Sequence, residues 1–110
     1  MLKIASDSHL FGETIIEQSA LPTGMLKHVA VVIDDTGGSA SLCVDGVCGA
    51  SVPLSGAIGA LSRVNNWLGR SNYAVDPELN GILHEFRIYN APLGASLISA
   101  SFAAGPDAAL

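Results

Sequence analysis

The two cysteines of this 110-residue chain, Cys43 and Cys48, flank the dipeptide Asp45-Gly46 symmetrically. Asp-Gly between short apolar runs is a strong signal for a two-residue β-hairpin loop, because both loop residues need positive φ. In that hairpin Val44 faces Val47 as a hydrogen-bonded pair, and the cysteines form the next pair, whose side chains lie closer together. The spacing therefore allows a cross-strand disulfide in an oxidising compartment. The alternative is two free thiols that pack as small hydrophobic groups.

A polar segment with two aromatic residues carries the candidate ligand-binding side chains. Its amide and carboxylate oxygens could contact sugar hydroxyls, and an aromatic ring could stack on a sugar. The candidates are Trp67, Asn72, Tyr73, Asp76, Glu78 and Asn80. The alternative interpretation is that Asn, Asp, Pro and Gly simply make turns and that the tryptophan covers apolar surface. We expect no cofactor and no metal site, with calcium, which prefers oxygen ligands, as the alternative.

The sequence contains no recognisable catalytic constellation. Sandwich glycosidases need two carboxylates close together, whereas Glu85 stands alone on its predicted strand and Asp34-Asp35 lies in a predicted turn. No serine lies in a GxSxG motif, and no histidine is near either cysteine in the sequence. His9, His28 and His84 share no metal-ligand spacing, so we expect them to be hydrogen-bonded structural residues. The sequence therefore predicts that the protein is not an enzyme.

Composition limits the class of protein. Hydrophobic residues make up 49% of the chain and charged residues 14%, so the chain can bury a core in one domain. The net charge is −5 and the five basic residues are scattered, which argues against a nucleic-acid partner. No apolar run approaches the roughly 20 residues of a membrane span. The first residues do not form a signal peptide, because an aspartate interrupts them before any long apolar region.

Short β-branched runs separated by glycine-rich turns predict the elements that position these residues. A run of alternating or continuously apolar residues indicates a strand, and frequent glycines indicate turns. The predicted strands cover residues 2–4, 14–16, 27–34, 39–44, 47–52 and 82–90, with Asp7-Ser8 in a loop. Residues 92–102 are predicted to hold one short helix with Pro92 in its first turn, and residues 103–110 a loose tail. The pattern predicts an all-β antiparallel sandwich with one short C-terminal helix.

Alternation along these strands predicts the core. On the strand over 82–90 we expect the face with Phe86 and Ile88 to be buried, which places His84 beside the core. Leu68 is expected to point inward and Trp67 outward. The predicted core residues are Val29, Val31, Ile33, Leu42, Val44, Leu68, Phe86 and Ile88.

Four motifs together resemble the C-terminal half of laminin-G-like, concanavalin A-like domains. They are His28-Val-Ala-Val-Val32, Ala40-Ser-Leu-x-Val-Asp-Gly46, Trp67-Leu-Gly-Arg-Ser71 and Asn80-Gly-Ile-Leu-x-Glu-Phe-Arg-Ile-Tyr-Asn90. The resemblance covers roughly Lys27 to Leu97 and implies a jelly-roll β-sandwich over one domain, 1–110, with 1–26 weakly assigned and shortened. Lys27, His84 and the cysteine pair depart from the family pattern, and His84 in place of an aspartate argues against a carried-over calcium site.

The resemblance implies a function and a location. It suggests a non-catalytic binding module that recognises a carbohydrate or a protein surface. The alternative is a structural or assembly element that self-associates through unpaired strand edges, as a homo-oligomer or against a neighbouring domain. It also implies an extracellular or cell-envelope location, where disulfides persist, and this favours the bridge between Cys43 and Cys48.

Overall fold

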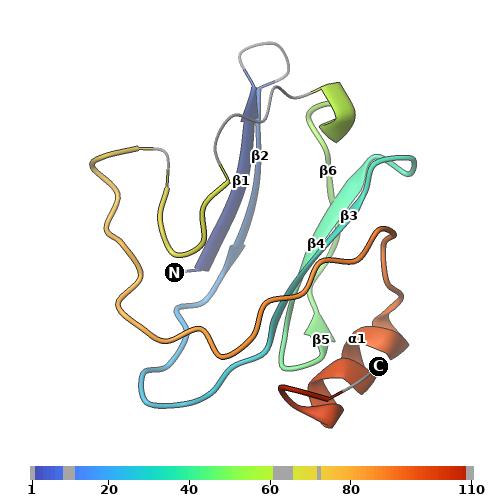
Figure 1. Ribbon diagram of the computed structural model, residues 1–110. Helices are drawn as coiled ribbons and strands as arrows, with labels where there is room; N and C mark the ends of the chain where they lie inside the picture. The colour runs from blue at the N-terminus through green and yellow to red at the C-terminus, as the bar shows by residue number, and fades with distance from the viewer. Residues whose placement is uncertain (1, 9–11, 61–65, 72, 109–110) are drawn as a thin grey trace.

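The computed structural model describes residues 2–8, 12–60, 66–71 and 73–108. Its elements are β1 (Leu2–Ser8), β2 (Gly12–Gln18), β3 (Val29–Asp34), β4 (Ser39–Val44), β5 (Val47–Cys48), β6 (Val52–Pro53), a 3₁₀ helix (Ile58–Ala60) and α1 (Ala95–Ala104). The chain is thus mostly antiparallel β-structure with one short C-terminal helix, as predicted (Figure 1).

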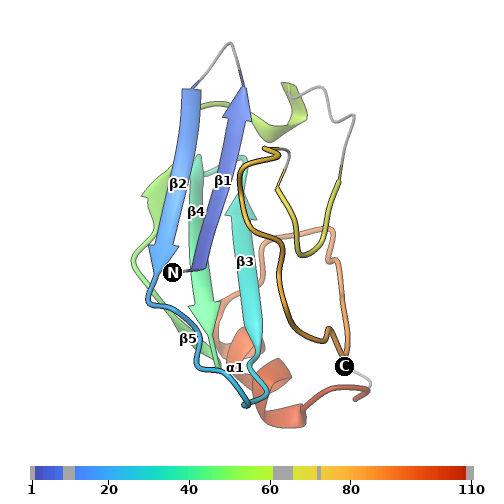
Figure 2. The same cartoon turned by 90° about the vertical axis from the view of Figure 1, so that its left-hand side faces the viewer.

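Two sheets build the fold. β1 and β2 form an antiparallel hairpin, while β3, β4 and β5 form a second sheet in that order, with β6 also paired to β4. β2 contacts β4 and β6, and Figure 2 shows the β1–β2 hairpin in front of the second sheet. The helix contacts β5 at the lower end of this sheet. The described residues do not close into the predicted jelly-roll sandwich.

The ends of several strands differ from the prediction. β1 and β2 are longer than the strands predicted over 2–4 and 14–16, and Asp7 and Ser8 belong to β1, paired with Glu13 and Gly12. The strand predicted over 47–52 is divided into β5 and β6, which both pair with β4. It still ends at Pro53, whose missing N–H cannot continue a ladder.

The strand predicted over residues 82–90 is wrong, because this segment has no ladder partner among the described residues. An extended segment becomes a strand only where a neighbour pairs with its backbone, and the alternating pattern cannot supply that neighbour. Phe86 and Ile88, predicted to be buried, are 60% and 82% exposed, and His84 is exposed rather than beside the core.

The C-terminal elements also differ in detail. α1 begins after Gly94, so Pro92 lies ahead of the helix instead of in its first turn. The tail is not loose as far as residue 108, because it is held by the segment before the helix. The Glu85 carboxylate accepts a hydrogen bond from the Asp107 N–H at 2.8 Å, and the Arg87 guanidinium donates to the Ala108 carbonyl.

Leu42 on β4 is the centre of the core. It is 1% exposed and lies in a cluster with Ala40, against which Val52 and Leu54 pack. The predicted core is otherwise largely wrong. Val44 is half-buried, whereas the remaining predicted residues are exposed: Val29, Val31, Ile33, Leu68, Phe86 and Ile88. Val29, Val31 and Ile33 of β3 share the face of Leu42 but stay exposed, because β3 is an edge strand with no further ladder partner among the described residues.

The hairpin between β4 and β5 has the predicted turn and the predicted disulfide. Asp45 and Gly46 have φ of 50° and 79°, as a primed turn requires. Cys43 and Cys48 are bonded, with Cα atoms 3.9 Å apart, and Cys43 is fully buried. A Cβ at Gly46 would lie 3.2 Å from atoms of Phe102 and Ser99, so the close packing of α1 on this turn requires glycine.

Asp45 joins this turn to the start of β3. Its carboxylate accepts hydrogen bonds from the Lys27 ammonium at 2.5 Å and from the His28 N–H at 3.0 Å. The bond from Lys27, followed by that from His28, lowers the pKa of the Asp45 carboxyl below its ordinary value. The His28 ring lies 6.0 Å from the Phe102 ring, and its buried Nδ1 has no hydrogen-bond partner among the described residues.

We therefore expect Asp45→Asn to change how stability depends on pH. Because the folded-state pKa of Asp45 is lowered, its carboxylate contributes stability above the ordinary value of 3.8, and this contribution is lost as pH falls through the lower folded-state value. Asparagine tolerates positive φ, so the turn is retained. In urea unfolding over a pH series, the variant should be less stable at neutral pH and approach the wild type in acid. Parallel curves would contradict the assigned role of Asp45.

Candidate functional site

Residues 66–83, which we call the 66–83 loop, contain most of the predicted ligand-binding residues and no described helix or strand. The loop has two arms, one that contains Gly69 and one that contains Leu79. A backbone hydrogen bond joins them, in which the Leu79 N–H donates to the Gly69 carbonyl at 2.7 Å. Gly69 has φ of +76°, and a Cβ there would lie 3.3 Å from Leu79 Cβ. Any residue with a side chain would therefore strain the backbone at the point where the two arms meet. At the tip, the Tyr73 N–H donates to Ser71 Oγ at 2.8 Å.

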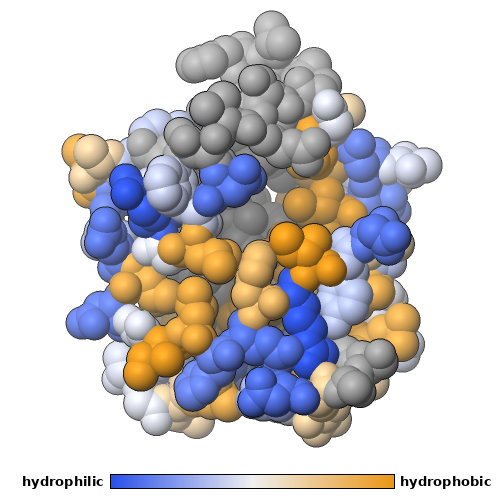
Figure 3. Space-filling view, viewed as in Figure 1, coloured by the Kyte–Doolittle hydropathy of each residue, from blue (hydrophilic) through white to orange (hydrophobic). Residues whose placement is uncertain are grey.

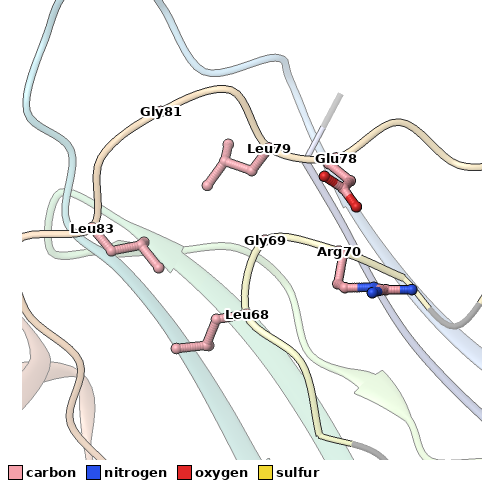
Figure 4. Close-up of a pocket in the computed structure, with 7 residues that line it drawn as sticks. All are labelled: Leu68, Gly69, Arg70, Glu78, Leu79, Gly81 and Leu83. Carbon is pink, nitrogen blue, oxygen red and sulfur yellow. The ribbon is translucent and has the colours of Figure 1, made fainter.

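An open pocket of about 310 Å³ lies between the two arms of the loop. Its lining residues are Leu68, Gly69, Arg70, Glu78, Leu79, Gly81 and Leu83. Figure 4 shows the three leucine side chains directed toward one another, with Arg70 and Glu78 together on the other side. The pocket thus combines an apolar wall with one cation and one anion, an arrangement that can hold a ligand with both apolar and hydrogen-bonding surfaces.

Trp67 lies next to this pocket and contacts Arg70. The Arg70 guanidinium lies over the Trp67 ring, 4.5 Å from its centroid, which is a cation–π distance. The ring is half exposed, at 49%. The guanidinium therefore covers part of the aromatic surface that the sequence analysis assigned to sugar stacking, and it orients Arg70 at the pocket.

The predicted ligand-binding residues lie in one loop, but of those that the structure describes only one lines the pocket. That residue is Glu78, while Trp67 lies beside the pocket through its contact with Arg70. Tyr73, Asp76 and Asn80 are exposed and do not line it, although the Asp76 N–H donates to the Tyr73 carbonyl at 3.1 Å. Asn72 lies outside the described residues.

The prediction missed the leucines and Arg70. Leu68 was assigned to the core, yet it is 54% exposed and lines the pocket. The signal in the sequence was the combination of apolar residues with glycines at both arms, Leu68-Gly69 and Leu79-Asn80-Gly81. Pattern alone cannot distinguish a pocket wall from a core, because both are built from the same apolar side chains.

The segment from 67 to 89 carries an unusual amount of exposed apolar surface. Hydrophobic side chains gather on the lower left of Figure 3, where Figure 1 draws the chain leading toward α1. The exposed large apolar residues here are Trp67, Leu68, Tyr73, Val75, Leu79, Ile82, Leu83, Phe86, Ile88 and Tyr89. Apolar side chains that gather on an exposed face are a mark of an interaction site.

The Glu85 carboxylate of this segment is held by two contacts. Glu85 accepts from the Asp107 N–H and pairs with the Arg87 guanidinium, and these contacts, in that order, lower the pKa of its carboxyl. A general acid needs a raised pKa instead.

Within the described ranges, no three or more His, Cys, Asp or Glu side chains cluster as a metal site would require. No helix in the described part of the chain is long and apolar enough to cross a bilayer.

Comparison with known proteins supports the resemblance identified in the sequence. A family model described as the concanavalin A-like lectin/glucanases superfamily matches residues 4–99. A solved S-layer domain-containing protein (residues 221–444) from Clostridium thermocellum ATCC 27405 matches 89% of this chain at 27% identity, with a TM-score of 0.58. The match covers 49% of that solved chain, so this chain spans about half its length. A search of curated proteins finds no significant match.

Proposed function

The chain belongs to the concanavalin A-like lectin/glucanase superfamily, and from this premise we propose that it is a non-catalytic binding module. The ligand is a carbohydrate or a protein surface, held by the 66–83 loop. The observation that supports this proposal is the pocket, in which three leucines face Arg70 and Glu78 beside the half-exposed Trp67. A sugar ring presents an apolar face and a hydroxyl rim, and this pocket has a surface for each.

The absence of catalysis is part of the proposal. Glycoside hydrolysis needs one carboxyl group with a raised pKa and a second carboxylate on the other side of the scissile bond. The Glu85 carboxyl has a lowered pKa and is held by Asp107 and Arg87. Glu78 shares the pocket with Arg70, and no second carboxylate lines that pocket among the described residues. We propose no cofactor; calcium held by Asn72, Asp76, Glu78 and Asn80 is the alternative to the hydroxyl contacts.

A glycan array tests the ligand-binding proposal. We expect the protein to bind a subset of glycans and Trp67→Ala to weaken that binding about thirtyfold, because an aromatic hot spot contributes roughly 2 kcal/mol. Removing Trp67 also removes the ring over which the Arg70 guanidinium lies, so Arg70 would lose its position at the pocket as well. Titration calorimetry on the strongest hit gives the dissociation constants.

Tyr89→Ala is the matched control. Tyr89 is an aromatic residue of similar exposure, 44%, and it does not line the pocket. It should leave the affinity for the glycan unchanged. If both variants lose affinity equally, or if binding persists in Trp67→Ala, the 66–83 loop is not the sugar site.

A second candidate function is a structural or assembly role. It is favoured by the outer edge of β3, which pairs with no other described strand, together with the likeness to part of an S-layer domain-containing protein. In this reading the chain is a domain of a cell-envelope or extracellular protein, and the disulfide fits such a compartment.

We also propose that residues 1–110 form a single domain whose two sheets correspond to the layers of a jelly-roll sandwich.

A further inference from the structure

β3 has one open edge, and the hydrogen bonds that this edge can offer are defined by the structure. Among the described strands β3 pairs only with β4. The Asp45 N–H donates to the His28 carbonyl at 2.8 Å, so the backbone groups of His28 are directed toward β4. Because these directions alternate along an antiparallel strand, Ala30 and Val32 also face β4. The N–H and C=O groups of residues 29, 31 and 33 therefore face the open edge.

We propose that this edge pairs with the same edge of a second copy, antiparallel, with Val31 opposite Val31 of the partner. The inference rests on the assembly role proposed above and specifies its partner, edge and register. In a continuous sheet, the side chains of two paired residues lie on the same face. Because side chains alternate along each strand, the two residue numbers of a pair must both be odd or both be even, so their sum is even. With a sum of 62, Val29 faces Ile33, Val31 faces Val31 and Ile33 faces Val29. All three pairs exchange both backbone hydrogen bonds.

Charge selects this register over its neighbours. With Val31 at the two-fold axis, Lys27 lies opposite the partner's Asp35. A shift of the sum to 60 or 64 places Lys27 opposite Ile33 or Gly37 instead. Among the described residues, Lys27 uses one of its three donors on Asp45, and Asp35 accepts the Ile58 N–H through Oδ1, so both groups have capacity for the contact. Opposite charges on facing residues stabilise a strand pair. In the shifted registers Lys27 faces an uncharged residue, so this stabilisation is lost.

Burial on the same edge agrees with this pairing. The side chains of Val29, Val31 and Ile33 share one face and are 39–42% exposed. Pairing places each of them against a β-branched residue of the partner, which removes this apolar surface from water. β3 also contains no proline, and its one charged residue is Asp34 at its end, so residues 29–33 lack the groups that protect edge strands from association.

Residues 82–89 pass this side of the sheet in both views, so a second copy would have to displace them (Figures 1 and 2). They have no ladder bonds to lose. Glu85 and Arg87 in this segment contact residues 107 and 108, and Leu83 lines the pocket of the 66–83 loop. The displaced segment is therefore a smaller obstacle than a paired strand would be.

Cysteine cross-linking tests the edge and the register together. Both native cysteines are bonded to each other, so a new cysteine is the sole free thiol. In Val31→Cys the new thiols face each other across the axis at a Cα separation that suits a disulfide, and mild oxidation should give a covalent dimer on a non-reducing gel. Val29→Cys is the matched control. It faces Ile33, so it should remain monomeric on the gel.

Sedimentation velocity separates this inference from the proposals above. The wild type should form dimers, and Val31→Lys should raise the dissociation constant about tenfold, because two lysines would then face each other. A wild type that stays monomeric at its highest soluble concentration overturns the pairing. A dimer in which Val31→Cys does not cross-link, or Val29→Cys cross-links equally, overturns the register while the assembly role stands. The glycan array tests ligand binding by the 66–83 loop in a separate measurement.

Discussion

Leu42→Ala is expected to lower the free energy of unfolding by about 2–5 kcal/mol. Leu42 is 1% exposed and is the larger of the two residues in the buried apolar cluster on β4. β4 is also the strand to which β3, β5 and β6 all pair, so a cavity there loosens every strand of the second sheet. In a chain of this size, such a loss is a large part of the total stability.

Urea denaturation followed by circular dichroism measures the effect. Val47→Ala is the matched control, because Val47 is an apolar residue of the same sheet but is 72% exposed. It should change the free energy of unfolding by less than about 0.5 kcal/mol. If the two variants lose the same amount of stability, Leu42 is not the centre of the core.

Removal of the disulfide is the second large effect. The bridge joins residues five apart in sequence, and the chain-entropy model gives roughly 2 kcal/mol for so short a loop. In the double variant Cys43→Ala/Cys48→Ala, the loss of buried sulfur adds to this figure, because Cys43 is fully buried. The expected result is a lower midpoint of thermal unfolding, with the native β-type circular dichroism spectrum retained at low temperature.

A reducing agent provides the control for that measurement. The wild type with reductant should approach the double variant, and the double variant itself should not respond to reductant. A wild type whose stability is unchanged by reduction, although its thiols then alkylate, would show that the turn and α1 hold the hairpin without the bridge. The contacts of Phe102 and Ser99 with Gly46 are the interactions that would then be responsible.

The hairpin from Cys43 to Cys48 was predictable because its determinants are local. Asp45-Gly46 supplies two residues that tolerate positive φ, and a two-residue loop leaves one choice of register for the strands beside it. The facing of the two cysteines followed from that register. The family was predictable for a related reason, because its motifs are short and occur at characteristic spacings, and the match over residues 4–99 confirmed it.

The segment over 82–90 shows where sequence reasoning failed. Its alternation is that of a strand, yet a strand also needs a partner at the right distance, and no described segment pairs with it. The burial of Phe86 and Ile88 was wrong for the same reason, since a face is buried only when another layer covers it. The pocket was likewise missed, because it depends on the crossing of Gly69 and Leu79, two residues far apart along the loop.

The sequence by itself determined the turn at Asp45-Gly46, the pairing of the cysteines and the buried position of Leu42. Each of these follows from local backbone preference and from alternation on a strand that has neighbours on both sides. The tertiary structure alone decided which apolar residues stay exposed, that Leu68 and Leu79 form a pocket wall with Arg70, and that β3 keeps an open edge. These depend on contacts between segments distant in the chain, and an apolar side chain carries the same pattern whether a core, a ligand or a second copy covers it.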